Sequence, residues 1–130
     1  MKRITQEWVD RAEDDFVIVE REFRARKRPS YGGMCFHAQQ CVEKYIKARM
    51  SEAGHPKPIP RTHDLVALLD VVLRIEPTWE SFRESLAYLS QYAVAFRYPG
   101  ETADRSRALD ARRRCRSFRN AARRGLGITE

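Results

Sequence analysis

The sequence has no long hydrophobic run. Its longest apolar stretch, residues 65–73, is interrupted by Asp70, whereas a membrane-spanning helix needs about 18 or more consecutive apolar residues. The first residues pass directly into a charged amphipathic pattern, so we expect no signal peptide. Three cysteines, an odd number without a secretion signal, fit free thiols in a reducing compartment. We therefore expect a cytoplasmic protein with no membrane association.

Familiar catalytic signatures are also missing. The chain has no Gly-rich phosphate loop, no Ser-His-Asp set and no pair of carboxylates of obvious catalytic type. His37 and Cys41 are four residues apart and are acceptable metal ligands on one helix face. They have no second pair at metal spacing, and a buried thiol is the ordinary explanation of such a cysteine. The sequence predicts neither a metal nor another cofactor.

What the sequence does contain is helical periodicity. The 130 residues are 42% hydrophobic and 33% charged, enough for one domain with one core. Apolar residues recur at three- and four-residue spacing, and no segment alternates as a strand would. With short connections, this pattern predicts one all-α domain over residues 1–130. The expected architecture is an antiparallel four-helix up-and-down bundle with an additional short helix.

Two long helices are expected before the proline-rich segment. The first is capped by Thr5 and runs to about Ala25. Its apolar stripe is Trp8, Ala12, Phe16, Val19 and Phe23. The firm part of the second helix spans residues 34–53, and Gly54 ends it. Its apolar stripe is Ala38, Cys41, Val42, Tyr45 and Ile46. On its other faces, Glu43 precedes Lys47 by four residues, the favourable order for a helical ion pair.

Three further helices follow the prolines at 56, 58 and 60. A short one opens at residues 61–65 with Thr62 as its N-cap. Between Trp79 and Phe96 the apolar spacing alternates between three and four residues, which predicts one long helix whose stripe is core or partly a dimer seam. Thr102 caps the last helix, which Gly125 and Gly127 end. Its buried line is Ala108, Ala111, Cys115, Phe118 and Ala122.

The positive charge is concentrated in the last helix. The chain carries a net charge of +7, and residues 103–124 hold nine arginines against Asp104 and Asp110. Such a field favours an acidic partner, which is a nucleic acid, a nucleotide or an acidic protein. The alternative is a solvated arginine-rich helix with no partner.

Three stretches together resemble the HEPN domain family over roughly residues 5–125. They are FHAQQCVEKYIKA at 36–48, RTHDL at 61–65 and YAVAFRYPG at 92–100. The resemblance implies a helical bundle, often a homodimer, that is tied to nucleotides and RNA. It also implies a minimal nucleotidyltransferase as the protein partner, in a toxin–antitoxin type pair.

Many proteins of this family are metal-independent ribonuclease toxins, and they carry an Arg followed after four to six residues by a His. No histidine follows Arg97 in this chain. Arg49 precedes His55 at a matching interval, but this match falls at the tail of the second helix and is assigned to chance. The chain instead resembles the Arg-Tyr-Pro branch, so we expect a binding module and no catalytic residues.

The expected binding residues are Arg97 and Tyr98, where the predicted fourth helix ends. The arginine would hold a phosphate and the tyrosine would stack on a base; alternatively, both close the end of the bundle, or Arg97 pairs with Glu43. Electrostatic support is expected from Lys44, Lys47, Arg112 and Arg116. Possible supporting residues are His37, Glu43, His63 and Asp64, although a capping role suits the last two better.

Two other functions remain open. One is a ribonuclease that uses Arg97 with His37 or His63. The other is a protein-interaction scaffold whose basic last helix binds an acidic protein.

Overall fold

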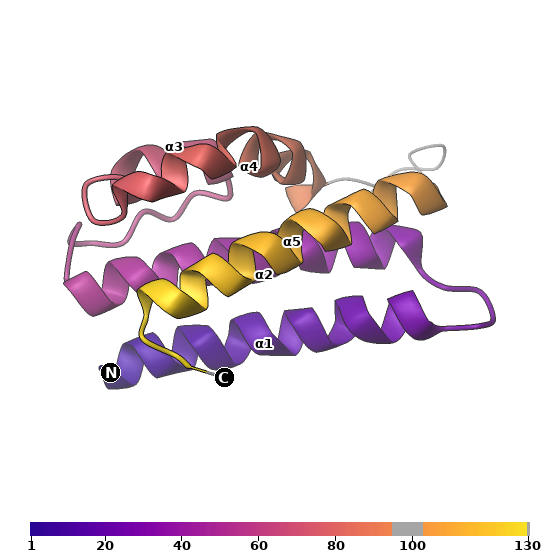
Figure 1. Ribbon diagram of the computed structural model, residues 1–130, viewed down its shortest axis with the longest axis horizontal. Helices are drawn as coiled ribbons and strands as arrows, with labels where there is room; N and C mark the ends of the chain where they lie inside the picture. The colour runs from indigo at the N-terminus through magenta and orange to yellow at the C-terminus, as the bar shows by residue number, and fades with distance from the viewer. Residues whose placement is uncertain (95–102, 130) are drawn as a thin grey trace.

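The computed structural model describes residues 1–94 and 103–129. Over those residues the chain forms five α-helices and two 3-10 segments and contains no strand. Three helices are long: α1 (Arg3–Arg24), α2 (Tyr31–Ala53) and α5 (Arg105–Gly125). Figure 1 shows α1 and α5 lying along α2, with the shorter helices above its other side. The predicted all-α bundle is confirmed, and α2 is its central helix.

The first two helices begin earlier than the sequence predicted. Thr5 lies inside α1 and is buried, so the prediction that it caps the helix is wrong; the N-cap is Lys2. The side chain of Ser30 caps α2 by accepting a hydrogen bond from the amide of Gly33 at 3.0 Å. This cap fixes the start of α2 before the two glycines that sequence reasoning treated as loose. Gly54 ends α2 in the left-handed conformation with φ 70°, as predicted.

The buried face of α1 is rotated from the predicted stripe. Ala12 and Val19 are fully buried as expected, and Val9 joins them. Trp8 and Phe16 are only half-buried, and the side chain of Phe23 is exposed. The reason is that arginines from α5 cover Phe16 and Phe23 in place of the apolar core. Phe16 and Phe23 therefore form an edge of α1 on which arginine side chains stack.

A short helix follows the proline segment, as expected, but its cap differs. Helix α3 spans Leu65–Val72 and buries Leu65, Leu68, Leu69 and Val72. Asp64 is the N-cap and accepts hydrogen bonds from the amides of Val66 and Ala67. The predicted cap, Thr62, lies two residues earlier, and its side chain accepts from the amide of Asp64 at 3.0 Å. The carboxylate is placed at the helix end, where the dipole favours it.

The predicted long helix from Trp79 to Phe96 is not one helix. The chain instead forms a 3-10 segment η1 (Pro77–Phe82), helix α4 (Arg83–Ser90) and a 3-10 turn η2 (Gln91–Ala93). In a 3-10 segment residues three apart are in line, so Trp79 and Phe82 both meet Phe118 of α5 edge-on, with ring centroids 5.0 and 5.2 Å away. Packing against Phe118 explains the tighter winding. Phe96 lies outside the described residues.

Helix α5 matches its predicted buried line. Ala108, Ala111, Cys115, Phe118 and Ala122 are all fully buried. The N-cap is Asp104, whose carboxylate accepts from the amide of Arg107 at 2.8 Å, and the predicted cap Thr102 lies outside the described residues. Gly125 ends the helix as expected.

None of the helices described is long and apolar enough to span a bilayer.

Candidate functional site: the polar side of α2

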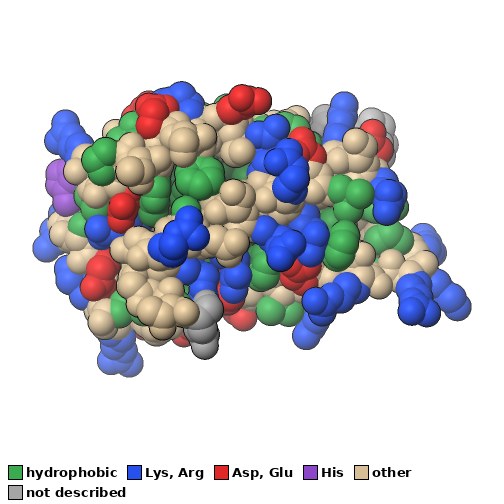
Figure 2. Space-filling view, viewed as in Figure 1, with side chains coloured by type: hydrophobic (Ala, Val, Ile, Leu, Met, Phe, Trp, Pro, Cys, Tyr) green, Lys and Arg blue, Asp and Glu red, His purple; other side chains and the backbone are tan. Residues whose placement is uncertain are grey.

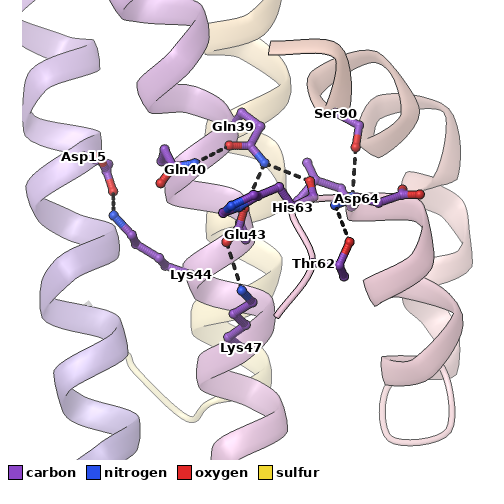
Figure 3. Close-up of polar contacts among 11 residues, drawn as sticks. Asp15, Gln39, Gln40, Glu43, Lys44, Lys47, Thr62, His63, Asp64 and Ser90 are labelled. Atoms are coloured by element: carbon purple, nitrogen blue, oxygen red, sulfur yellow. Dashed lines mark hydrogen bonds and ion pairs between the residues drawn. The ribbon is translucent and has the colours of Figure 1, made fainter. Parts of the chain in front are cut away.

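The polar side of α2 is buried, although its sequence looks like a solvated face. Gln39, Glu43 and Lys47 are exposed by only 0%, 4% and 6%. Figure 3 shows these side chains on the side of α2 that faces away from α5, between α1 and the segment that carries Thr62 and His63. Buried polar groups of this kind require partners, and each of the three has one. Two of the three resemblance motifs therefore meet here in space.

The Glu43 carboxylate is the centre of the first cluster. Its Oε1 accepts hydrogen bonds from the side-chain Nε2 of Gln39 at 3.0 Å and from His63 Nδ1 at 2.9 Å. Its Oε2 accepts from Lys47 Nζ at 3.0 Å, which confirms the predicted helical ion pair. Burial alone would raise the pKa of Glu43, but the hydrogen bonds from His63, Lys47 and Gln39 outweigh it and hold the pKa below its usual range. The carboxylate is therefore ionised at neutral pH.

His63 connects this cluster to solvent. Because an ionised carboxylate can only accept, Nδ1 is the protonated nitrogen that donates to Glu43. The imidazole side chain is nevertheless 61% exposed. A buried carboxylate thus fixes the orientation of a ring whose other edge reaches water, an arrangement suited to hydrogen bonding or proton transfer. The main-chain carbonyl of His63 also accepts from Gln39 at 3.2 Å.

Asp15 of α1 organises a second cluster beside the first. It is 5% exposed, and its two oxygens accept from His37 Nδ1 at 2.7 Å and from Lys44 Nζ at 2.6 Å. Figure 3 shows Lys44 reaching from α2 to Asp15 across the gap between the helices. Sequence reasoning missed Asp15, whose only signal was its place on the same helical face as Ala12 and Val19.

A hollow of about 320 Å³ lies next to Lys44. It is lined by Lys44 together with Ile4, Glu7, Trp8 and Arg11 of α1. Trp8 is half-buried, and Lys47 Nζ sits 5.7 Å from the centre of its ring. An indole ring with two cations and a carboxylate around an open concavity can stack on a base and hold phosphate or ribose groups. Trp8 and Arg11 were not among the predicted site residues.

Several arginines of α5 bind carboxylates and stack on aromatic rings of α1. Arg119 holds Glu13 by two hydrogen bonds of 2.7 and 2.6 Å and stacks on Phe16, with its guanidinium carbon 4.2 Å from the ring centre. One heptad earlier in α5, Arg112 holds Glu20 at 2.9 and 3.3 Å and stacks on Phe23 at 3.5 Å. We call these two units the Glu-x-x-Phe clamps. Bidentate pairing and ring stacking are both geometries that favour arginine over lysine.

The predicted electrostatic residues are thus already engaged. Lys44 pairs with Asp15, Lys47 with Glu43 and Arg112 with Glu20. Arg116 is 3.7 Å from Glu20 and its side chain is 53% exposed, so it remains the most accessible of the four. Six of the arginines in α5 pair with a carboxylate; they are Arg112, Arg113, Arg114, Arg116, Arg119 and Arg123. These six arginines share three carboxylates, those of Glu13, Glu20 and Asp110, so the helix keeps a net positive charge.

Arg97 and Tyr98, the principal predicted binding residues, lie outside the described residues. Asp64 is engaged as the cap of α3. Arg49, which precedes His55 at the interval of the ribonuclease motif, pairs with Glu76 at 2.7 Å.

The described part of the chain contains no group of three or more His, Cys, Asp or Glu side chains that converges as metal ligands would. The thiols of Cys35, Cys41 and Cys115 are all buried and free. Burial, with Cys115 as a neighbour, raises the pKa of Cys41 well above its usual range. Such thiols behave as small core residues.

The fold and the polar side of α2 define a class of small helical bundles built around one central helix. A family comparison then identifies the family: the model of the HEPN domain matches residues 5–125, and the chain belongs to that family. The HEPN domain is a module associated with nucleotides and RNA. A search of curated proteins and a search of solved structures both find no match.

Proposed function

We propose that this HEPN domain is a nucleotide- or RNA-binding module and that Lys44, Trp8 and Arg11 make its main contacts among the described residues. The observation that carries the proposal is the hollow beside α2, where an aromatic ring, two cations and a carboxylate converge. A base stacks on Trp8, phosphate oxygens bind Arg11 and Lys44, and Glu7 accepts from ribose hydroxyls. Lys47 packs against the indole ring, with Nζ 5.7 Å from its centre, while its charge is paired with Glu43.

The wider setting of the proposal follows from the family resemblance. We propose that Arg97 and Tyr98 add a phosphate contact and a stacking contact, with Arg112 and Arg116 as long-range support. The protein acts in the cytoplasm as a homodimer and works with a minimal nucleotidyltransferase in a toxin–antitoxin type pair. This part of the proposal rests on resemblance alone. Co-purification of the two proteins and the mass of the complex in solution test it.

A second candidate function, a metal-independent ribonuclease, is supported by His63. Its Nδ1 is fixed by the buried Glu43 carboxylate while the ring is 61% exposed, which is how a general base is oriented. This function requires RNA cleavage that persists with a chelator and is lost in His63→Ala. His55→Ala is the matched control, since His55 is exposed and lies in the loop after α2.

The test of the binding proposal is a titration with ATP and with labelled single-stranded RNA. Ligand should quench tryptophan emission, because Trp8 borders the hollow and the other tryptophan, Trp79, is 3% exposed. Arg11→Gln should weaken binding by about tenfold without changing the melting temperature, since Arg11 is exposed. Arg74→Gln, another exposed arginine, is the control. If neither ligand binds the wild-type protein at low salt, the binding proposal is wrong.

A further inference from the structure

One end of the bundle carries positive charge that the described part of the molecule does not neutralise. This basic end consists of five exposed cations at the end of α1, on the α1–α2 connection and at the start of α5. They are Arg24, Arg26, Lys27, Arg28 and Arg105. None of the five is within ion-pair distance of a described carboxylate, in contrast to the paired arginines farther along α5. Figure 2 shows Lys and Arg side chains projecting from the end of the molecule where Figure 1 places this connection.

The acids nearest the basic end are already occupied. Glu20 holds Arg112 and Arg116, and Glu22 accepts from the amide of Ser30 at 2.6 Å. Asp104 caps α5. The bond from Ser30 to Glu22 also ties the connection back to α1. Glu22 and Asp104 keep their charge because their hydrogen-bond donors are neutral amides, but the five cations outnumber them, so the field at this end is positive and favours a polyanion.

The local shape fits a ligand with a backbone of phosphates. Arg26 and Arg105 line a hollow of about 220 Å³ with Phe23 and Tyr31, so elements distant in sequence present two cations and two aromatic rings to one space. Glu22 also lines this hollow. Arg28 adopts a left-handed backbone with φ 49°, a conformation that non-glycine residues rarely adopt. Guanidinium groups beside aromatic rings are the contacts that single-stranded RNA uses.

We propose that the basic end binds the phosphate backbone of a single-stranded RNA whose bases reach the Trp8 hollow, so that the ligand is RNA and not a mononucleotide. This inference rests on the proposed binding function and adds its substrate class. Trp8 and Arg24 are sixteen residues apart on one helix, about 24 Å at the rise of an α-helix. A mononucleotide cannot bridge that distance, whereas a strand of several nucleotides does.

The test removes three charges from the basic end and compares RNA with ATP. In Arg26→Gln/Lys27→Gln/Arg28→Gln, RNA affinity should fall by about tenfold or more at low salt. The slope of log K against log salt should fall by about 2, since each lost phosphate contact on a single strand contributes about 0.7. Affinity for ATP should not change. The matched control is Lys57→Gln/Arg61→Gln/Arg74→Gln, which removes the same charge from exposed residues on the loops around α3.

The outcomes separate the two proposals. If wild-type protein binds RNA and the basic-end variant binds it as tightly as the control variant does, the inference is wrong while the binding function stands. Equal loss in both variants would also overturn it, because net charge alone would then explain the effect. If polyglutamate competes as well as RNA, the assignment to phosphates fails. Arg26→Gln/Arg105→Gln, checked by thermal melting, is a second variant should the first not fold.

Discussion

At the scale of single residues, the Glu43 carboxylate connects the buried polar side chains of α2. Its carboxylate accepts from Gln39, His63 and Lys47, and both members of the Glu43–Lys47 pair are nearly inaccessible to water. Breaking such a pair leaves a buried charge without compensation, which costs more than the pair contributes when intact.

Glu43→Gln should therefore lower the free energy of unfolding by about 3–5 kcal/mol, because Lys47 keeps its charge and loses its carboxylate. Urea denaturation measures the change. The control is Glu84→Gln on α4, where the side chain is exposed and a change within about 0.5 kcal/mol is expected.

Glu43 also predicts a pH dependence of the free energy of unfolding. Since the pKa of Glu43 is lower in the folded protein than its ordinary value of 4.5, its contribution is present above pH 4.5 and is lost as pH falls through the folded value.

The acid-induced loss of stability should therefore be shallower in Glu43→Gln than in the wild-type protein. If Glu43→Gln leaves the free energy of unfolding at neutral pH unchanged, or leaves its pH dependence in acid unchanged, the buried Glu43 carboxylate does not stabilise the fold as proposed.

Much of this residue-scale picture follows from the sequence, and part of it does not. The Glu43–Lys47 pair follows from four-residue spacing. The contact with His63 does not, because twenty residues and a proline segment separate the partners. Trp8 was assigned to the apolar stripe, and only the three-dimensional neighbours of its ring reveal an open hollow. Local spacing is therefore readable from sequence, whereas convergence of distant segments is not.

At the scale of elements, α1 and α5 are joined by the two Glu-x-x-Phe clamps. Each clamp combines a two-point ion pair with a guanidinium stacked on a ring. Helix periodicity predicted both helices and the buried line of α5, but it assigned Phe16 and Phe23 to the core. Periodicity reports which face a residue occupies and not whether an apolar or a charged neighbour covers it.

The clamps should contribute more than surface ion pairs do. A double-mutant cycle with Glu13→Gln and Arg119→Gln should give a coupling energy of about 1–2 kcal/mol. Burial raises the pKa of Glu13, but the hydrogen bonds from Arg119 and Tyr45 outweigh it and keep the pKa below its usual range. The control cycle uses Asp70→Asn and Arg83→Gln, whose side chains are 59% and 39% exposed, and should give less than about 1 kcal/mol. Equal coupling energies in the two cycles would show that a clamp contributes no more than a surface ion pair.

The segment after Pro77 shows where element prediction fails. Three- and four-residue spacing from Trp79 onwards is compatible with one long helix, yet the chain winds as 3-10 around Phe118 before α4 begins. A 3-10 segment and an α-helix both place residues three apart on one side, so spacing alone cannot separate them.

At the scale of the whole molecule, the core encloses all three thiols. Cys35, Cys41 and Cys115 are fully buried, and burial raises the pKa of Cys35 to about 11. A thiol reagent at pH 8 should therefore react with none of them on a timescale of minutes, because all three are inaccessible and the raised pKa values of Cys35 and Cys41 also disfavour their thiolates. In denaturant all three should react at once. A single fast thiol in the native protein would mean that one of these packing contacts opens locally.

The clamps also have a consequence for how the chain is made. Glu20 and Arg112 are separated by 92 positions, and Glu13 and Arg119 by 106. During synthesis α1 and α2 emerge long before α5, so the side of α2 that α5 covers stays open while most of the chain is translated. Domains at this stage expose apolar surface and are prone to aggregate. The nascent protein therefore completes its fold only when the arginines of α5 have left the ribosome, and the face of α2 that α5 covers is open to aggregation until then.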